Sequence, residues 1–396
     1  MNDCLFFGSN EKPILFKNEP NKIIKPIQFK FENENENEKQ IKQALLSEFS
    51  TIFLFENGKA IEYLNDSKQN PKKIQIENIQ KVTVGHQNEA ILTIEGNVFA
   101  KGRNINPENP NEFINISSLI EDTNDRIIED VLCGFSSVYL LTSNQNVYGI
   151  GSNLSNQLGL DSETLKKTEK PILMMKNVSK MFSGISTSIF LLNSNQELFG
   201  CGFNRYGRLG LGIKETKIKT LTKIQNIPKG KIIDIQCGYS HSIMLIENED
   251  ENPKRKLYSC GYSQYNGLDK DGNAYEFTEI KSSLFGNDNI ILDFSVGRQH
   301  TLILTSNSKL IVFGNNSYEQ LGTGDTKSQP IPIQIELPKL RFKEEIFNYH
   351  VSCGFNNSFL YYSPFLSSFS NLEEDLIKLF EEKNFVIFHL KPKMEK

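Results

Sequence analysis

The sequence predicts an all-β protein: a seven-bladed β-propeller closed by pairing of its N- and C-terminal strands, plus a short C-terminal helix. Three observations predict this fold: a repeat of about fifty residues, strand-like apolar runs within each repeat, and half a repeat left over at each end. We expect the propeller to span residues 1–362, with strand 4–10 completing the last blade together with residues 351–362, and residues 363–396 to form a helical tail.

A glycine that precedes an apolar run marks each repeat. Gly134 begins a run that ends at Leu141, a polar turn follows, and a second run covers residues 147–153. The same order recurs from Gly184 through residues 198–204. Further copies begin at Gly238, Gly297 and Gly354, and weaker ones begin at Gly85 and at Phe49, where Glu48 takes the place of the glycine. A period of about fifty residues is typical of propellers.

Each repeat predicts a β-hairpin. Both apolar runs have strand length and are rich in branched and aromatic residues, and a short polar turn joins them. In the first repeat this turn contains Asn57-Gly58, a pair that readily adopts the type I′ conformation of tight hairpins. Because an isolated hairpin is barely stable in water, we expect further strands to extend each sheet and neighbouring sheets to pack together.

The two ends of the chain carry complementary half-repeats. The last first half, residues 351–362, has no second half after it, because Ser363-Pro364 and a polar segment follow. At the other end, residues 5–10 match the second half at 147–153 in form. Pairing of these two orphans would complete one blade and leave no exposed sheet edge.

The repeat pattern resembles the regulator of chromosome condensation family, whose members form seven-bladed propellers. The resemblance rests on Cys-Gly-x-x-(His/Ser)-(Ser/Thr), an apolar run, Val/Leu-Tyr/Phe-x-x-Gly-x-Asn and then Gln/Arg-Leu-Gly, and it covers about residues 1–362. The family usually has Trp before the second glycine. This chain has no Trp and carries Lys101, Ile150, Cys201, Cys260 and Phe313 at those positions.

The resemblance also implies a role in binding proteins. The founding member promotes nucleotide exchange on the small GTPase Ran, and the resemblance places its partner-facing residues, several of them acidic, within three positions of the blade glycines. The matching positions in this chain carry no carboxylate. We therefore expect a non-enzymatic protein-protein interaction platform that binds its partner through loops of a propeller face. The alternative is a guanine nucleotide exchange factor for a small GTPase.

The candidate partner-binding residues lie in these loops and are aromatic, His, Arg or Gln. Aromatic residues and Arg are enriched among residues that dominate binding energy. For the two histidines three residues after a glycine, the alternative is that each ring fixes its blade through hydrogen bonds. The candidates are His86, Gln87, Phe135, Tyr239, His241, Arg298, Gln299, His300 and Phe355.

The sequence predicts no catalytic residue, cofactor or metal site. No nucleophile, base and orienting acid recur at a plausible spacing. Cys133, Cys237 and Cys353 occupy equivalent positions of different repeats, which a whole blade separates, so they should not converge on one zinc ion. We expect these cysteines to act as small buried apolar residues.

Charge and hydropathy exclude several kinds of partner. The chain has 44 Lys and Arg against 48 Asp and Glu, a net charge of −4, so a basic field that attracts nucleic acid or an anionic membrane is not expected. The N-terminal residues lack the basic and apolar regions of a signal peptide, and no apolar stretch approaches 18 residues. We expect a monomer in the cytoplasm or the nucleus.

Three segments lie outside the repeat pattern. Residues 31–39 form an acidic segment of low complexity, which we expect to be a solvated connection between blades. Residues 247–256 lengthen one hairpin loop with acidic and then basic charges, and the loop is either simply exposed or a partner-binding projection. In the tail, Ser370 or Asn371 can cap a helix, which would pack against the propeller. This helix and residues 385–388 resemble the opening of a BTB domain, as in a BTB-linked family member truncated at its C-terminus.

Overall fold

The computed structural model describes residues 4–8, 41–46, 50–64, 72–184, 186–248, 250, 254–281, 290–306, 309–336 and 347–364. Strands dominate this part of the chain, and its helices are the short 3₁₀ turns η2 (Ser117–Leu119), η3 (Thr123–Asp125) and η4 (Arg205–Gly207). Within these ranges no helix has the length and apolar character needed to cross a membrane. The acidic segment 31–39, the predicted tail helix, the BTB-like segment and part of the 247–256 loop lie outside the described residues.

Six four-stranded antiparallel sheets contain most of the strands, and each strand pairs with the next one along the chain. In chain order they are β2 (Ile41–Leu46), β3 (Ser50–Phe55), β4 (Ala60–Leu64) and β5 (Lys72–Lys73); β6 (Ile79–Val84), β7 (Asn88–Thr93), β8 (Val98–Gly102) and β9 (Ile114–Asn115); β10 (Ile128–Cys133), β11 (Ser137–Thr142), β12 (Val147–Ser152) and β13 (Lys167–Met175); β14 (Val178–Phe182), β15 (Ser188–Asn193), β16 (Leu198–Phe203) and β17 (Lys217–Lys223); β18 (Lys231–Cys237), β19 (His241–Glu247), β20 (Arg255–Gly261) and β21 (Ala274–Glu279); β22 (Ile291–Val296), β23 (His300–Thr305), β24 (Lys309–Gly314) and β25 (Gln329–Glu336).

The remaining sheet joins the two ends of the chain. It has three strands, β1 (Cys4–Gly8), β27 (Asn357–Pro364) and β26 (Phe347–Cys353), with β27 in the middle. The antiparallel register of β1 and β27 runs from Cys4 opposite Tyr361 to Gly8 opposite Asn357. The predicted pairing of the terminal strands is therefore confirmed. Seven complete blades were expected, whereas the described residues form six four-stranded blades and this three-stranded sheet, because no fourth strand is described beside β1.

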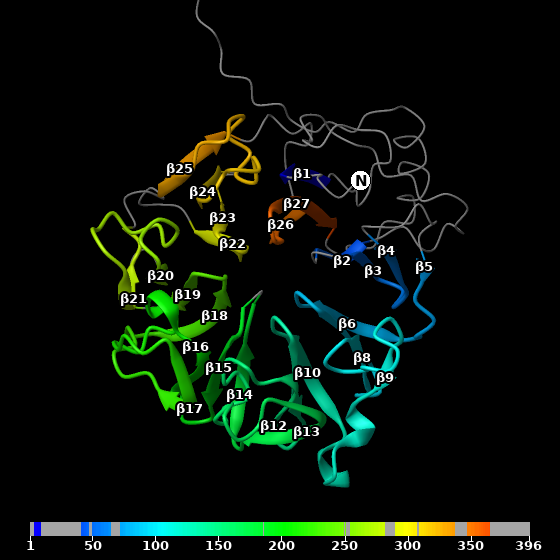
Figure 1. Cartoon of the computed structure of the whole chain (residues 1–396). Coiled ribbons are helices and arrows are strands. Elements are labelled where there is room, and N and C mark those ends of the chain that lie inside the picture. Colours follow the sequence, from blue (N-terminus) through cyan, green and yellow to red (C-terminus); the bar gives the residue numbers. More distant parts are fainter. Residues whose placement is uncertain are drawn as a thin grey trace, which may run out of the picture.

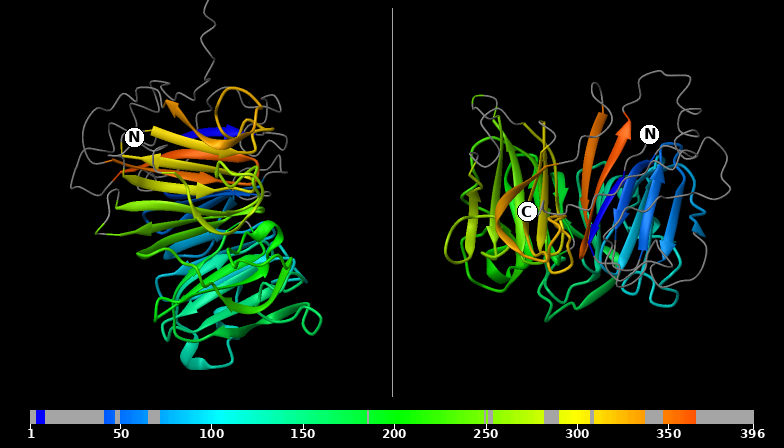
Figure 2. Two further views of the ribbon diagram at one scale, coloured as in Figure 1. Left: turned by 90° about the vertical axis from the view of Figure 1, so that its left-hand side faces the viewer. Right: turned by 90° about the horizontal axis from the view of Figure 1, so that it is seen from above.

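The sheets stand around a ring (Figure 1). The first strand of each four-stranded blade is its inner strand, and β26 takes this place in the three-stranded sheet. Inner strands of neighbouring sheets contact one another from β2 round to β26 and back to β2, except that β14 meets β11 rather than β10. Figure 2 shows the same sheets from the side, with their strands running between the two faces of the ring. The fold is an all-β propeller.

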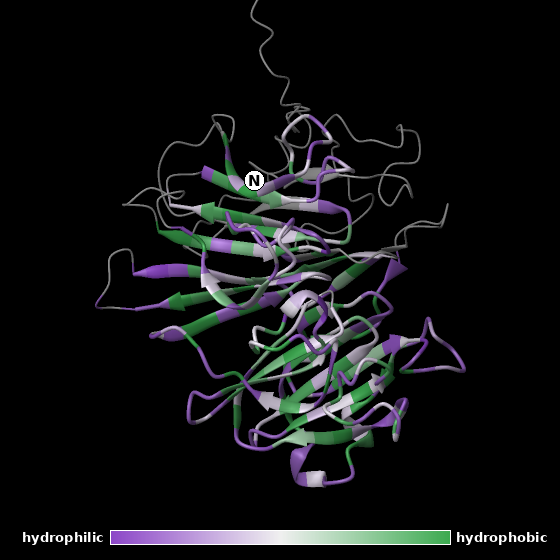
Figure 3. Ribbon diagram, turned by 60° about the vertical axis from the view of Figure 1, so that its left-hand side comes forward, coloured by the Kyte–Doolittle hydropathy of each residue, from purple (hydrophilic) through white to green (hydrophobic). Residues whose placement is uncertain are grey.

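The core lies in layers between neighbouring sheets. Every residue of the second strands β3, β7, β11, β15 and β23 is buried. One apolar cluster combines Ala90 and Val98 of one blade with Val131 and Val138 of the next. Figure 3 shows the apolar residues along the strands and many of the polar residues in the loops. Alternate burial against two neighbours explains why both faces of the middle strands are apolar.

The second glycine of the repeat is required by backbone conformation. Gly202 has a φ of +104°, a region that disfavours residues with a side chain, and a Cβ there would collide with the carbonyl oxygen of Thr187. Gly151, Gly261 and Gly314 repeat this conformation at the ends of β12, β20 and β24. The glycines therefore allow the backbones of neighbouring strands in one blade to approach closely without a clash.

Ring closure can be tested by removing β1. Deleting residues 1–10 leaves β27 with an unpaired edge, so we expect the free energy of unfolding to fall by several kcal/mol out of the roughly 5–15 kcal/mol typical of a domain. Deleting residues 1–3, which precede β1, is the matched control and should leave stability unchanged. Chemical denaturation measures both. An unchanged melting temperature in the longer deletion would contradict closure by β1.

Candidate functional site

The loops that follow the blade glycines meet one another at one end of the ring. Their backbones are hydrogen-bonded from blade to blade: Tyr239 N donates to Arg298 O at 2.8 Å, Arg298 N donates to Gly354 O at 3.2 Å, and Gln87 N donates to Phe135 O at 3.0 Å. These bonds fix the direction of the residue that follows each glycine. The side chains at these positions consequently converge, although they are far apart in the sequence.

Five of these side chains form one continuous stack, which we call the axial cluster: His86, Phe135, Tyr239, Arg298 and Phe355. The His86 and Phe135 rings are parallel, with centroids 4.1 Å apart, and the His86 and Phe355 centroids are 5.2 Å apart. The Arg298 guanidinium lies 4.1 Å from the centroid of Phe355 and 5.3 Å from that of Tyr239. Tyr239 is 37% exposed and the other four are half-buried. Five of the predicted site residues are thus brought together, and partner binding by them stays a prediction.

Arg298 carries a charge without a counter-ion in the described part of the chain. Its guanidinium contacts two aromatic faces, and no described carboxylate lies within ion-pair distance of it. Its Nε atom is buried and has no hydrogen-bond acceptor among the described residues. A buried donor without an acceptor is costly, so the surroundings of this guanidinium are electrostatically incomplete.

Arg208 contacts the Tyr239 loop from the core, and it was not among the site residues predicted from the sequence. Its side chain is fully buried and donates to the Tyr239 carbonyl oxygen, to Ser188 Oγ at 3.1 Å and to Phe203 O at 2.7 Å. Burial lowers the pKa of Arg208 to about 10. The signal was available, because Arg208 replaces the Gln of the Gln-Leu-Gly element in its repeat. We assign it the positioning of the Tyr239 loop.

His241 and His300 belong to the core, which corrects their placement among the partner-facing candidates. Both are fully buried. His241 Nε2 lies 2.8 Å from Thr301 Oγ1, and His300 Nε2 lies 2.8 Å from Ser358 Oγ, so each ring is bonded to the next blade. Burial lowers the pKa of each imidazole to about 3. The alternative of a structural role is therefore the correct one, with the bonds running between blades.

The two remaining candidates flank the cluster. Gln87 is exposed, and its Oε1 atom accepts a hydrogen bond from Ser136 Oγ of the next blade at 3.2 Å. Gln299 is half-buried, and its main-chain carbonyl oxygen accepts a hydrogen bond from Asn315 N at 2.8 Å. Contact of either side chain with a partner stays a prediction.

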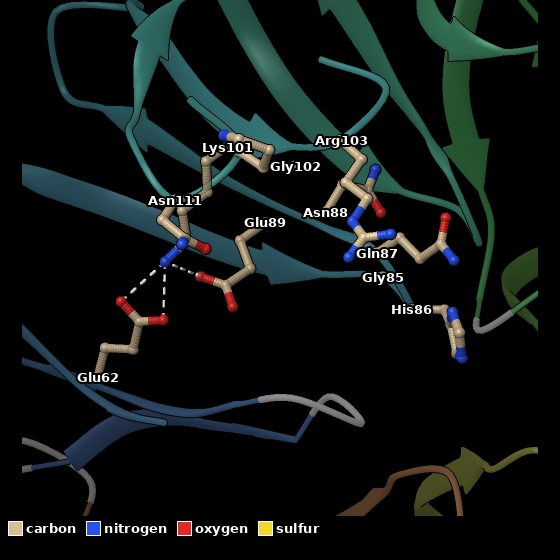
Figure 4. A pocket seen from close by; sticks show the side chains of 11 residues that line it. Glu62, Gly85, His86, Gln87, Asn88, Glu89, Lys101, Gly102, Arg103 and Asn111 are labelled. Carbon is tan, nitrogen blue, oxygen red and sulfur yellow. Dashed lines mark hydrogen bonds and ion pairs between the residues drawn. The ribbon is translucent and has the colours of Figure 1, made fainter. Parts of the chain in front are cut away.

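A cavity of about 330 Å³ opens beside His86 and Gln87. Lys101 lies on its wall between two buried carboxylates, with Nζ 2.7 Å from Glu62 Oε1 and 3.0 Å from Glu89 Oε2 (Figure 4). Ser50 donates a hydrogen bond to Glu89 Oε1. This triad joins the first two blades, at a repeat position where the sequence pattern leads one to expect Trp.

The triad carries one more negative than positive charge when all three groups are ionised. Burial is the main reason that the pKa of Glu89 is raised, and the charge of Glu62 adds to it against the opposing effect of Lys101. Burial alone would lower the pKa of Lys101, but the charges of Glu89 and Glu62 outweigh it and the pKa is raised. Lys101 therefore stays charged at neutral pH and holds both carboxylates.

The cysteines pack between blades. Cys133, Cys201, Cys237, Cys260 and Cys353 are free and buried. Cys260 Sγ donates to Arg208 O at 3.3 Å, and Cys353 Sγ donates to Ser295 O at 3.3 Å. Burial raises the pKa of Cys201 to about 12, which keeps the thiol protonated. Across the described ranges, no three His, Cys, Asp or Glu side chains gather as they would around a metal ion.

Comparison with known families confirms the resemblance predicted from the sequence. The chain carries regulator of chromosome condensation (RCC1) repeats, matched over residues 195–245 and 307–361 by one repeat profile and over residues 291–320 by a second. The first matched segment ends within β19, the segment 291–320 includes β23, and the last segment ends within β27. The matched residues therefore carry RCC1 repeats within a β-propeller fold.

Similar proteins fall into two groups. The ultraviolet-B receptor UVR8 of Arabidopsis thaliana is 27% identical over 232 residues, which cover 58% of this chain and 50% of that protein. The probable E3 ubiquitin-protein ligase HERC4 of Homo sapiens is 26% identical over 268 residues, 64% of this chain and 24% of that protein. The chain thus spans half or less of these curated relatives.

Solved structures share the fold over nearly their whole length. Prp20p of Saccharomyces cerevisiae has a TM-score of 0.74 at 18% identity, covering 96% of this chain and 95% of that one. Human WBSCR16 has a TM-score of 0.69 at 16% identity, covering 92% and 100%. At these identities the likeness establishes the propeller fold.

The buried histidines predict a loss of stability in mild acid. A folded-state pKa of about 3 against an ordinary value of 6.5 means that the stabilisation is complete above pH 6.5 and is lost as the pH falls toward 3. At pH 5 each ring should have lost about 2 kcal/mol relative to pH 7. Asn is the residue at the equivalent positions 88 and 357 of two other repeats. The double variant His241→Asn and His300→Asn should therefore fold, and its free energy of unfolding, measured in urea, should depend less on pH. An identical pH profile in the variant would contradict this.

The triad predicts a strong effect of losing its lysine. Lys101→Met leaves two buried carboxylates unpaired, so we expect the free energy of unfolding to fall by about 3–5 kcal/mol at pH 7. Loss of the lysine removes the charge that opposes the raised pKa of Glu89, so the deficit should be smaller at pH 4.5, where protonation of this carboxylate removes its charge. The control is Lys219→Met, which breaks an exposed pair with Asp161 and should cost about 1 kcal/mol or less. Equal losses in the two variants would disprove this account of the triad.

Proposed function

We propose that this chain is a non-catalytic protein-interaction platform whose partner docks on the axial cluster. The observation that carries the proposal is the convergence of His86, Phe135, Tyr239, Arg298 and Phe355 from five blades into one stack. These are mostly the residue types enriched among binding hot spots. None of the five lies deep in the core, so the stack is open to a partner.

The cluster is also held in place before binding. Backbone hydrogen bonds join the Tyr239, Arg298 and Phe355 loops, and Arg208 fixes the Tyr239 carbonyl from the core. Rings stacked on one another lose little further freedom when a partner covers them. Binding to a preorganised surface costs less conformational entropy, and this supports the use of the cluster as a docking site.

The comparisons agree with a protein partner. The structure of Prp20p was described together with its binding properties to Gsp1p and histones. The sequence positions that match the partner-facing positions of the founding member carry no carboxylate, so we limit the proposal to binding and leave nucleotide exchange out of it. Release of labelled GDP from a panel of small GTPases tests this limit, and accelerated release would overturn it.

The proposal predicts loss of binding without loss of fold. An affinity pull-down with mass spectrometry identifies the partner, and calorimetry then measures its affinity for each variant. The double variant Tyr239→Ala and Phe355→Ala should weaken binding by about thirtyfold or more, as expected for hot spots worth about 2 kcal/mol. The control pair Ile127→Ala and Leu173→Ala removes exposed apolar side chains outside the cluster and should bind normally. Full affinity in a folded Tyr239 and Phe355 variant would refute docking on the axial cluster.

A further inference from the structure

Among the described residues, the buried Nε donor of Arg298 has no hydrogen-bond acceptor. Tyr239 and Phe355 contact the guanidinium through their ring faces, at centroid distances of 5.3 and 4.1 Å. All five N–H bonds of a guanidinium point outward within its own plane, so ring contacts of this kind do not replace acceptors at its edges.

Arg208 shows what a satisfied arginine looks like in the same region. Its donors reach the carbonyl oxygens of Tyr239 and Phe203 and the hydroxyls of Ser188 and Thr187, with the last at 2.9 Å. The fold thus supplies acceptors where an arginine is structural. For Arg298 the described residues supply aromatic contacts and no acceptor for the buried Nε atom.

Charge around the cluster points to an anionic ligand. The residues that follow the cluster positions are Gln87, Ser136, Ser240, Gln299 and Asn356, none of which is acidic. The nearby buried carboxylate of Glu89 is already paired with Lys101 and Ser50. Among the described residues, Arg298 therefore gives the cluster a positive charge with no carboxylate paired to it.

The composition of the site narrows the kind of anion. A carboxylate matches the planar edge of a guanidinium with two parallel hydrogen bonds. The rings of Tyr239, Phe355 and Phe135 offer apolar contact to a neighbouring side chain, which a free phosphate could not use. A nucleic acid is disfavoured, because a single arginine in a chain of net charge −4 provides little neutralisation of a phosphate backbone.

We infer that the axial cluster binds an acidic peptide segment of a partner protein, with an Asp or Glu carboxylate on Arg298 and a flanking apolar side chain on Tyr239 and Phe355. This inference rests on the proposed function and specifies the partner's chemistry. Binding would complete the hydrogen bonding of Arg298 at the moment when the rings around it are covered.

The test uses an array of 12-residue peptides with a central Asp or Glu and random flanks, beside a matched array with Asn or Gln. The full-length chain should be retained about tenfold more strongly by the acidic array, as expected for a charge-assisted hydrogen-bonded pair. Arg298→Gln should abolish this preference and Arg298→Lys should restore part of it. The matched control is Arg205→Gln, because Arg205 also stacks on an aromatic ring, 4.8 Å from the centroid of Tyr206, but is exposed and outside the cluster.

The outcomes separate the inference from the proposed function. Equal retention by the two arrays, or an unchanged preference in Arg298→Gln, would overturn the acidic-peptide inference. If the acidic-peptide inference fails but Tyr239→Ala and Phe355→Ala still reduce retention of the chain by the peptides, the proposal of an interaction platform stands. If these variants do not reduce retention, the inference and the proposed function are both wrong. Stronger binding of a single-stranded oligonucleotide than of acidic peptides would also overturn the inference. So would a tenfold gain in peptide binding when Glu32, Glu34, Glu36 and Glu38 are changed to Gln, because the occupant would then be the chain's own acidic segment.

Discussion

The close approach of neighbouring blades at their glycines is the constraint on which the rest of the structure depends. A Cβ at Gly238 would lie 2.5 Å from the carbonyl oxygen of Gly297, and one at Gly297 would lie 2.8 Å from that of Gly354. Only glycine fits where the backbones of adjacent blades come this close. The same approach allows the blade-to-blade backbone hydrogen bonds that aim Tyr239, Arg298 and their neighbours toward one another. The geometry of the ring and the convergence of the axial cluster thus have one physical origin.

Sequence patterns predicted the propeller because its requirements are periodic. Glycines, hairpin turns and the terminal half-repeats each recur at fixed spacing, and the pairing of β1 with β27 follows from counting them. The sequence also predicted that the residues that follow the glycines lie in loops of one propeller face. For His241 and His300 the sequence left partner contact and a structural role both open, because the choice depends on the strand beginning at the third residue after the glycine, and strands β19 and β23 are covered on both sides.

Interactions between specific pairs of side chains do not recur from repeat to repeat, so the repeat pattern could not predict them. Lys101 occupies a position filled by Ile150, Cys201, Cys260 and Phe313 in other blades, and all five side chains are buried between blades. The carboxylates that neutralise Lys101, on Glu62 and Glu89, belong to no motif. A charged substitution at an apolar position can be seen in the sequence, but its partners are known only when the register of three strands is known. The same holds for Arg208 and its carbonyl acceptors.

The three-stranded sheet also sets the order in which the protein can be completed. Strand β1 leaves the ribosome first, yet its partner β27 begins only at Asn357. At a synthesis rate of about 5–20 residues per second, β1 waits roughly 20–70 s for a strand to pair with. During this time the inner strand β2 also lacks its neighbour β26, since the two belong to opposite ends of the chain. The ring therefore stays open until β27 has been synthesised, and closure is a late, long-range step of the kind that slows folding and exposes nascent edges to chaperones or to other chains.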